Sequence, residues 1–76
     1  MNKQKRNILA SVKKSLIQSS DIVSGVLDAE QDCLDNLPEN LETSELYEKI
    51  ELAIEKLEEA IDSIDSAVES IEEAMA

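Results

Sequence analysis

The chain has 76 residues and a net charge of −11, with one cysteine, one proline and no histidine. A single core in a chain this short supplies only ~3–5 kcal/mol, so stability must come from a staple or from partners. One cysteine excludes an intrachain disulfide, and the lack of histidine and of a cysteine cluster argues against zinc. We therefore expect well-packed helices and a homo-oligomer, a dimer or larger.

The charge is divided sharply along the chain. Residues 1–20 contain five basic side chains and no acid, whereas residues 21–76 contain all 18 acids and only two lysines. Such asymmetry indicates polarised partners or a polarised assembly. No apolar run of signal-peptide or membrane-spanning length follows the basic start. With one unpaired cysteine, a cytoplasmic location is expected.

A first helix is predicted over residues 3–36. Its apolar stripe follows a 3–4 spacing through Leu9, Val12, Leu16, Val23, Val26, Cys33 and Leu37, widened by Leu27 and Leu34. At this apolar position Cys33 is expected to be a small buried core residue rather than a reactive thiol. Weak helix formers predict a kink near 19–25, or a break into helices 3–18 and 21–36.

The single proline marks a junction at residues 37–42. A helix does not easily run through Pro38, and the residue before a proline is pushed out of the helical region. Asn36 is expected to end the first helix, and Thr43 or Ser44 to cap the second. Acids then occupy the first turns of the second helix, where the helix dipole favours negative charge.

A heptad repeat starting at Ile50 dominates the second predicted helix, residues 43–74. Large aliphatic residues recur at position a, alanine at d and further apolar residues at e. Three adjacent apolar columns are wider than the seam of a coiled-coil dimer, so they predict a bundle helix with more than one neighbour. The residues expected to pack in the core or oligomer interface are Ile50, Ala53, Ile54, Leu57, Ala60, Ile61, Ile64, Ala67, Val68 and Ile71.

Acids fill the opposite side of this helix. We call this row the acidic face; it consists of Glu51, Glu55, Glu58, Asp62, Asp65, Glu69 and Glu72. Residues four apart on a helix are separated by about 6 Å along the axis, a spacing comparable to that of phosphates. The row fits either an ordinary solvated face or a surface that imitates nucleic acid.

Together these elements predict an all-α fold: one domain, an antiparallel helical hairpin that assembles into a homo-oligomeric bundle. The hairpin closes within one chain or opens into a swapped dimer. In either case the basic end of the first helix meets the acidic end of the second, which brings Arg6 or Lys13 near Glu69, Glu72 or Glu73. Basic side chains then lie near the negative end of the second helix dipole.

An enzyme is not expected, because the chain has no histidine, no glycine-rich phosphate loop and no activated-nucleophile pattern. No cofactor or metal is expected either, since the carboxylates lie in regular rows instead of converging. Membrane binding is disfavoured by a small apolar face without Trp or Phe. Nucleic-acid binding is disfavoured by the acidic remainder of the chain.

The basic residues near the start are the best candidates for a site. Lys3, Arg6, Lys13 and Lys14 form either a salt-bridged helix end or, around an oligomer axis, an anion site in which arginine makes bidentate contacts. Tyr47, the only aromatic residue, is either a core residue or a ring that stacks on a base.

The junction Asp35-Asn36-Leu37-Pro38-Glu39-Asn40-Leu41-Glu42-Thr43-Ser44-Glu45 and the alanine heptads after it resemble a group of small helical proteins encoded by phages and mobile elements. Their junction reads like Asn-Leu/Met-Pro-Glu-Asn-Leu-Gln-x-Ser-Glu-Arg. This chain departs from it at Glu42, where the motif has Gln, and at Leu46, where it has Arg. Asn36 and Asn40 are then expected to cap helices or to contact a ligand.

The resemblance implies an accessory protein that counters host defence. The leading hypothesis is a sponge that sequesters a cyclic nucleotide or related anionic signal at the basic helices without cleaving it. The alternative is an acidic inhibitor, or nucleic-acid mimic, that blocks a basic host protein surface. A third hypothesis is a structural oligomerisation module.

Overall fold

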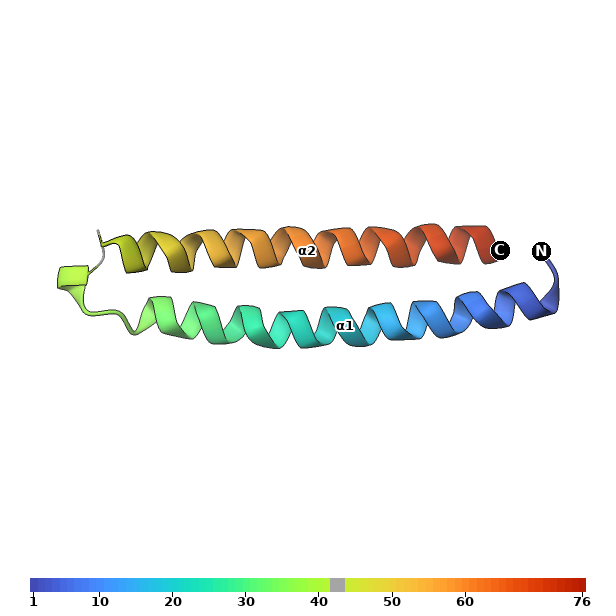
Figure 1. Ribbon diagram of the computed structural model, residues 1–76, viewed down its shortest axis with the longest axis horizontal. Helices are drawn as coiled ribbons and strands as arrows, with labels where there is room; N and C mark the ends of the chain where they lie inside the picture. The colour runs from blue at the N-terminus through green and yellow to red at the C-terminus, as the bar shows by residue number, and fades with distance from the viewer. Residues whose placement is uncertain (42–43) are drawn as a thin grey trace.

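The computed structural model describes residues 1–41 and 44–76 and consists of two long helices joined by a short connection (Figure 1). Helix α1 spans Lys3–Asp35, the 3-10 helix η1 spans Glu39–Leu41, and α2 spans Glu45–Met75. α2 folds back along α1, so both termini lie at one end of a rod measuring 59 × 15 × 13 Å. The predicted antiparallel hairpin is confirmed. Neither helix has the length of apolar sequence needed to cross a bilayer.

Side-chain caps set the helix ends where the sequence indicates. Asn2 caps α1 by accepting a hydrogen bond from the Lys5 N–H at 2.8 Å. Asn36 ends α1, as predicted, and its own side chain donates to the Asp32 carbonyl at 2.8 Å. Ser44 caps α2, because its Oγ accepts from the Tyr47 N–H at 3.2 Å. The alternative cap, Thr43, lies outside the described residues.

α1 is one unbroken helix, so the predicted break into helices 3–18 and 21–36 is wrong. Serine and glycine each cost a fraction of a kcal/mol, up to about 1 kcal/mol, inside a helix. The flanking Val23 and Leu27 are half-buried against α2. Burying such side chains stabilises the helix by more than the weak formers cost, since full burial is worth roughly 1.5–3 kcal/mol each.

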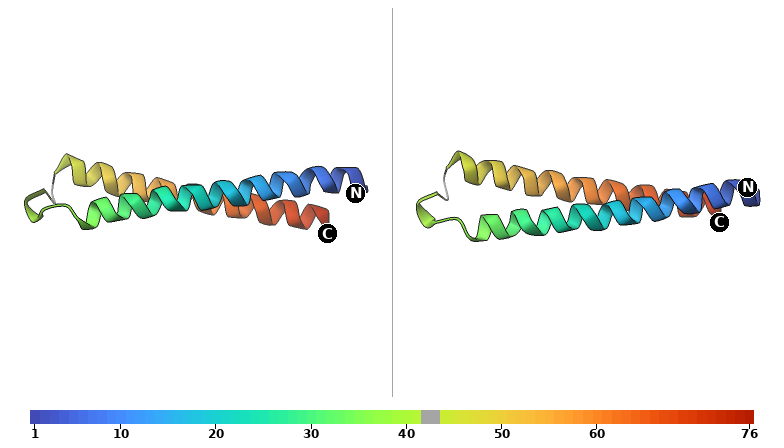
Figure 2. Two further views of the ribbon diagram at one scale, coloured as in Figure 1. Left: turned by 90° about the horizontal axis from the view of Figure 1, so that it is seen from below. Right: turned by 60° about the horizontal axis from the view of Figure 1, so that its bottom comes forward.

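The core is the contact between α1 and α2, which wrap around one another along their length (Figure 2). From α2, all ten residues predicted to pack are buried or half-buried, and Ile50 and Ile54 are the most enclosed at 9% and 8% exposure. The apolar residues that α1 contributes are Leu9, Leu16, Val23, Leu27 and Leu34. In the hairpin each helix has only the other as a neighbour, so most of the core stays half-exposed.

The single stripe predicted for α1 is divided between two faces. Leu9, Leu16 and Val23 turn towards α2, whereas Val12 and Val26 are exposed. Cys33 is also exposed, so the prediction of a buried core cysteine is wrong for the hairpin. The reason is geometric: residues three or four apart on a helix drift around its axis, and α2 covers only one of the two 3–4 series.

Ile54→Ala tests where the core lies. Because Ile54 is 8% exposed, truncating it is expected to lower the free energy of unfolding by roughly 2–3 kcal/mol, measured by urea denaturation at fixed protein concentration. Leu52→Ala is the matched control, because Leu52 is 53% exposed two residues away and its loss is expected to cost less than about 0.5 kcal/mol. Equal losses in the two variants would contradict this packing.

Candidate functional site

One ion pair joins the basic end of α1 to the acidic end of α2. The Nζ atom of Lys13 lies 3.2 Å from a carboxylate oxygen of Glu72, and both side chains are partly exposed. This confirms the predicted approach of the two charged ends. The pair lies one turn before the end of α2, where the helix itself supplies no basic residue. A cation there also opposes the negative end of the helix dipole.

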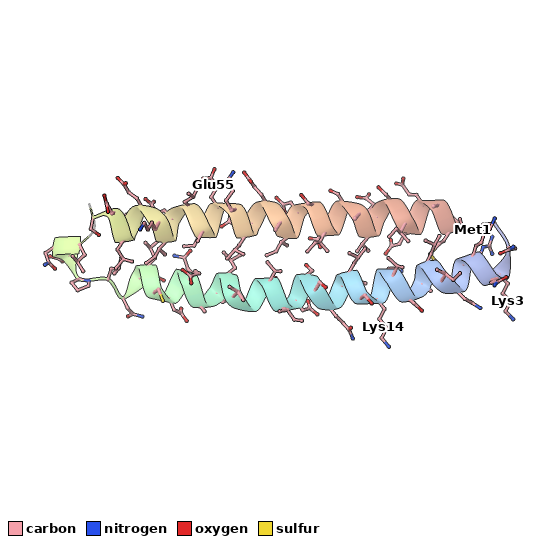
Figure 3. All side chains as sticks on the ribbon, in the orientation of Figure 1. Met1, Lys3, Lys14 and Glu55 are labelled. Carbon is pink, nitrogen blue, oxygen red and sulfur yellow. The ribbon has the colours of Figure 1, made fainter. Side chains whose placement is uncertain are left out.

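The remaining basic candidates point elsewhere. Lys3, Arg6 and Lys14 are exposed, and Figure 3 shows Lys14 directed away from α2 and Lys3 extending from the far end of α1. A shallow hollow of about 300 Å³ nevertheless lies beside the two consecutive lysines. It is lined by Ala10, Lys13, Lys14, Ile17, Gln18 and Met75.

The other three candidate ligand residues lie at the opposite end of the rod. Asn36 ends α1 and Asn40 is an exposed residue of η1. Tyr47 is half-buried in the first turn of α2, where its backbone N–H completes the Ser44 cap. Because α1 separates them from the lysines by most of the 59 Å length, the seven candidates do not form one site in a single chain.

The acidic face is exposed along its entire length. All seven carboxylates remain accessible, and Figure 3 shows Glu55 pointing away from α1. At a rise of 1.5 Å per residue, the row from Glu51 to Glu72 extends about 30 Å. Two of its members also contact α1: Glu72 pairs with Lys13, and Asp65 accepts a hydrogen bond from the Ser20 hydroxyl at 3.4 Å.

A second apolar face on α1 was not recognised from the sequence. We call it the outer seam; it consists of Ile8, Val12, Ser15, Ser19, Ile22, Val26, Ala29 and Cys33. All eight are exposed, and successive members are four and three residues apart in turn, which is the spacing of a helix-packing seam. This spacing was present in the sequence but was merged with the stripe that packs on α2.

Comparisons with protein-family models, with curated proteins and with solved structures gave no match to this chain. Across residues 1–41 and 44–76, no group of three or more histidine, cysteine or acidic side chains is arranged to hold a metal ion. The surfaces that the hairpin offers are therefore the basic end, the acidic face and the outer seam.

A double-mutant cycle on Lys13→Gln and Glu72→Gln tests the ion pair. Because both side chains are partly exposed, we expect a coupling free energy of about 0.2–1 kcal/mol at low salt, decreasing as salt is added. The measurement is thermal or urea unfolding of the two single variants and the double variant. The contact would be refuted by a coupling indistinguishable from zero in low-salt buffer.

Proposed function

We propose that this chain is a non-catalytic, self-associating accessory protein of phage type that covers a basic surface on a host protein with the acidic face of α2. The observation that carries this proposal is the acidic face itself, an exposed row of seven carboxylates of which Asp65 and Glu72 also contact α1. The resemblance of the junction to mobile-element proteins supports the setting, a host cytoplasm. Self-association is supported by the half-exposed core, because so short a hairpin gains little stability alone.

The chemistry of the proposed partner follows from the form of the face. A straight row of carboxylates about 30 Å long matches an elongated basic groove better than a single buried cation. Grooves of this kind hold the phosphate backbone of nucleic acids. The two lysines of α2 lie in its first half, so every charged side chain of α2 after Lys56 is acidic. No basic side chain of this stretch would repel the groove. The proposed inhibitor therefore competes with nucleic acid for such a groove.

Binding to a synthetic oligolysine peptide tests whether this face is the binding surface. Asp62→Asn combined with Glu69→Gln is expected to weaken binding roughly two- to thirtyfold, since each exposed charge pair contributes about 0.2–1 kcal/mol. Affinity is measured by calorimetry at two salt concentrations. For the unaltered chain it is expected to fall as salt rises.

The matched control removes two charges elsewhere, by Asp32→Asn with Glu39→Gln. These acids lie on α1 and η1 towards the junction, more than a screening length along the rod from Asp62 and Glu69. The control is expected to change oligolysine affinity less than twofold. Equal weakening in both variants would mean that only net charge matters, and the proposal would fail.

A second candidate, the nucleotide sponge, is favoured by the hollow that contains Lys13 and Lys14. An anionic ligand there would displace Glu72 from Lys13 and gain two cations. This arrangement would bind a phosphate group without hydrolysing it.

Native mass spectrometry with a panel of cyclic di- and trinucleotides tests this candidate and reports the subunit number in the same spectrum. A sponge would show bound nucleotide at micromolar concentration, with Lys14→Gln weakening binding at least about tenfold, as for a lost charged hydrogen bond. Lys49→Gln, which removes a lysine on α2 outside the hollow, is the control. The absence of any nucleotide-bound mass would exclude the sponge.

A further inference from the structure

The outer seam of α1 is an apolar surface that nothing in the hairpin covers. Ile8 is 57% exposed and Ile22 is 69% exposed, large values for isoleucines within a continuous helix. Isolated surface hydrophobics are ordinary, but six exposed apolar side chains along one helix face, on either side of Ser15 and Ser19, indicate a contact with another molecule. The row occupies the side of α1 that α2 leaves uncovered.

The surface area of the chain also exceeds that expected of a compact monomer. It exposes 5603 Å², whereas a folded monomer of 8.4 kDa is expected to expose roughly 4,600 Å². The excess of about 1,000 Å² is close to the roughly 800 Å² that each partner buries in a standard interface. One additional interface of standard size would bring the exposed area of each chain close to that of a compact monomer.

We infer that the outer seam binds the outer seam of a second copy, with the two α1 helices antiparallel. This inference rests on the self-association proposed above and specifies its face and direction. In one register the two residue numbers of each opposing pair add up to 41. In this register each layer joins a large side chain of one copy to a smaller side chain of the other. The layers are Ile8 on Cys33, Val12 on Ala29, Val26 on Ser15 and Ile22 on Ser19.

The charges of α1 select this direction and this partner. Residues 3–20 of the helix carry five basic side chains and no acid, and residues 21–35 carry five acids and no base. An antiparallel copy places each basic half beside an acidic half, for example Arg6 level with Asp35 of the second copy. A parallel copy would align like charges along the whole contact.

The glycine of α1 is consistent with a close approach. Gly25 lies one position before Val26 of the seam, in a regular helix where alanine would be more stable by roughly 0.5–1 kcal/mol. A Cβ atom at Gly25 would meet nothing within 4 Å in the hairpin, so packing on α2 does not require the missing side chain. A neighbouring helix at the edge of the seam would use that space.

The first arm of the test is the mass of the assembly, measured by sedimentation equilibrium. The unaltered chain is expected to sediment as a dimer or a multiple of it. Ile22→Glu brings two carboxylates to the centre of the seam and is expected to weaken association at least about tenfold. Leu52→Glu makes the same change on the outside of α2, where Leu52 is 53% exposed, and is expected to leave the mass unchanged.

The second arm determines the direction from disulfide cross-links and does not depend on how well Ile22→Glu folds. In the antiparallel dimer Cys33 lies far from its copy but level with position 8. Mild oxidation is therefore expected to cross-link the Ile8→Cys variant into a dimer, through bridges between positions 8 and 33 of different chains. The unaltered chain is expected to cross-link poorly, and the Leu52→Cys variant is the control for random collision.

The outcomes separate the inference from the proposal on which it rests. A monomer at every concentration would overturn both the self-association and the seam. An oligomer that Ile22→Glu leaves intact would overturn the seam alone. Efficient cross-linking of the unaltered chain through Cys33 would show parallel helices and overturn the antiparallel arrangement. The acidic face is tested separately, because the Asp62→Asn, Glu69→Gln variant is expected to bind oligolysine more weakly while its mass stays unchanged.

Discussion

The apolar contact between α1 and the three apolar columns of α2 is the constraint on which the rest of the molecule depends. Fully burying a large aliphatic side chain is worth roughly 1.5–3 kcal/mol, whereas each pair of like charges four residues apart costs only a few tenths. The heptads therefore tolerate a continuous row of carboxylates from Glu51 to Glu72. Because the columns face α1, the acids remain exposed to solvent, and only Asp65 and Glu72 of this row also contact α1.

The same contact leaves much of the apolar surface of the hairpin half-exposed. Ile50 and Ile54, near the junction, are nearly covered, whereas Leu57 and Ile61 further along the same columns stay half-exposed. α1 has the opposite arrangement, with leucines and a valine towards α2 and a second apolar row on its free side. The proposed self-association would bury further apolar area at these two surfaces, which a chain this small needs for stability.

Much of this architecture could be predicted from the sequence, because the signals were local. Pro38 fixed the junction, and the capping preferences of Asn36 and Ser44 fixed the ends of the helices within a residue or two. The strict repeat identified the inner face of α2. The approach of Lys13 to Glu72 followed from helix lengths and an antiparallel turn.

The failures involve α1, where the pattern is ambiguous. Two apolar 3–4 series run side by side along it, and spacing alone cannot tell which one packs on α2. The exposed position of Cys33 depended on that choice. The candidate ligand residues were grouped by chemical type, and the fold separates Lys14 from Tyr47 along the length of the rod. Residue type indicates which chemistry is available, but only the register indicates which residues meet.

The register of the hairpin also explains where the few basic residues lie. Lys13 pairs with Glu72 and Ser20 bonds to Asp65, so each step forward along α1 is matched by an equal step back along α2. This register places Lys56 level with Ala29 and Lys49 level with Asn36, beside the acidic half of α1. The two lysines of α2 therefore lie level with the acidic end of α1, and the last acids of α2, Glu69 to Glu73, lie level with its basic half. This pairing of opposite charges favours the antiparallel arrangement of α1 and α2. The unbalanced negative charge lies on the outer side of α2, the surface that would remain free in the proposed assembly through α1.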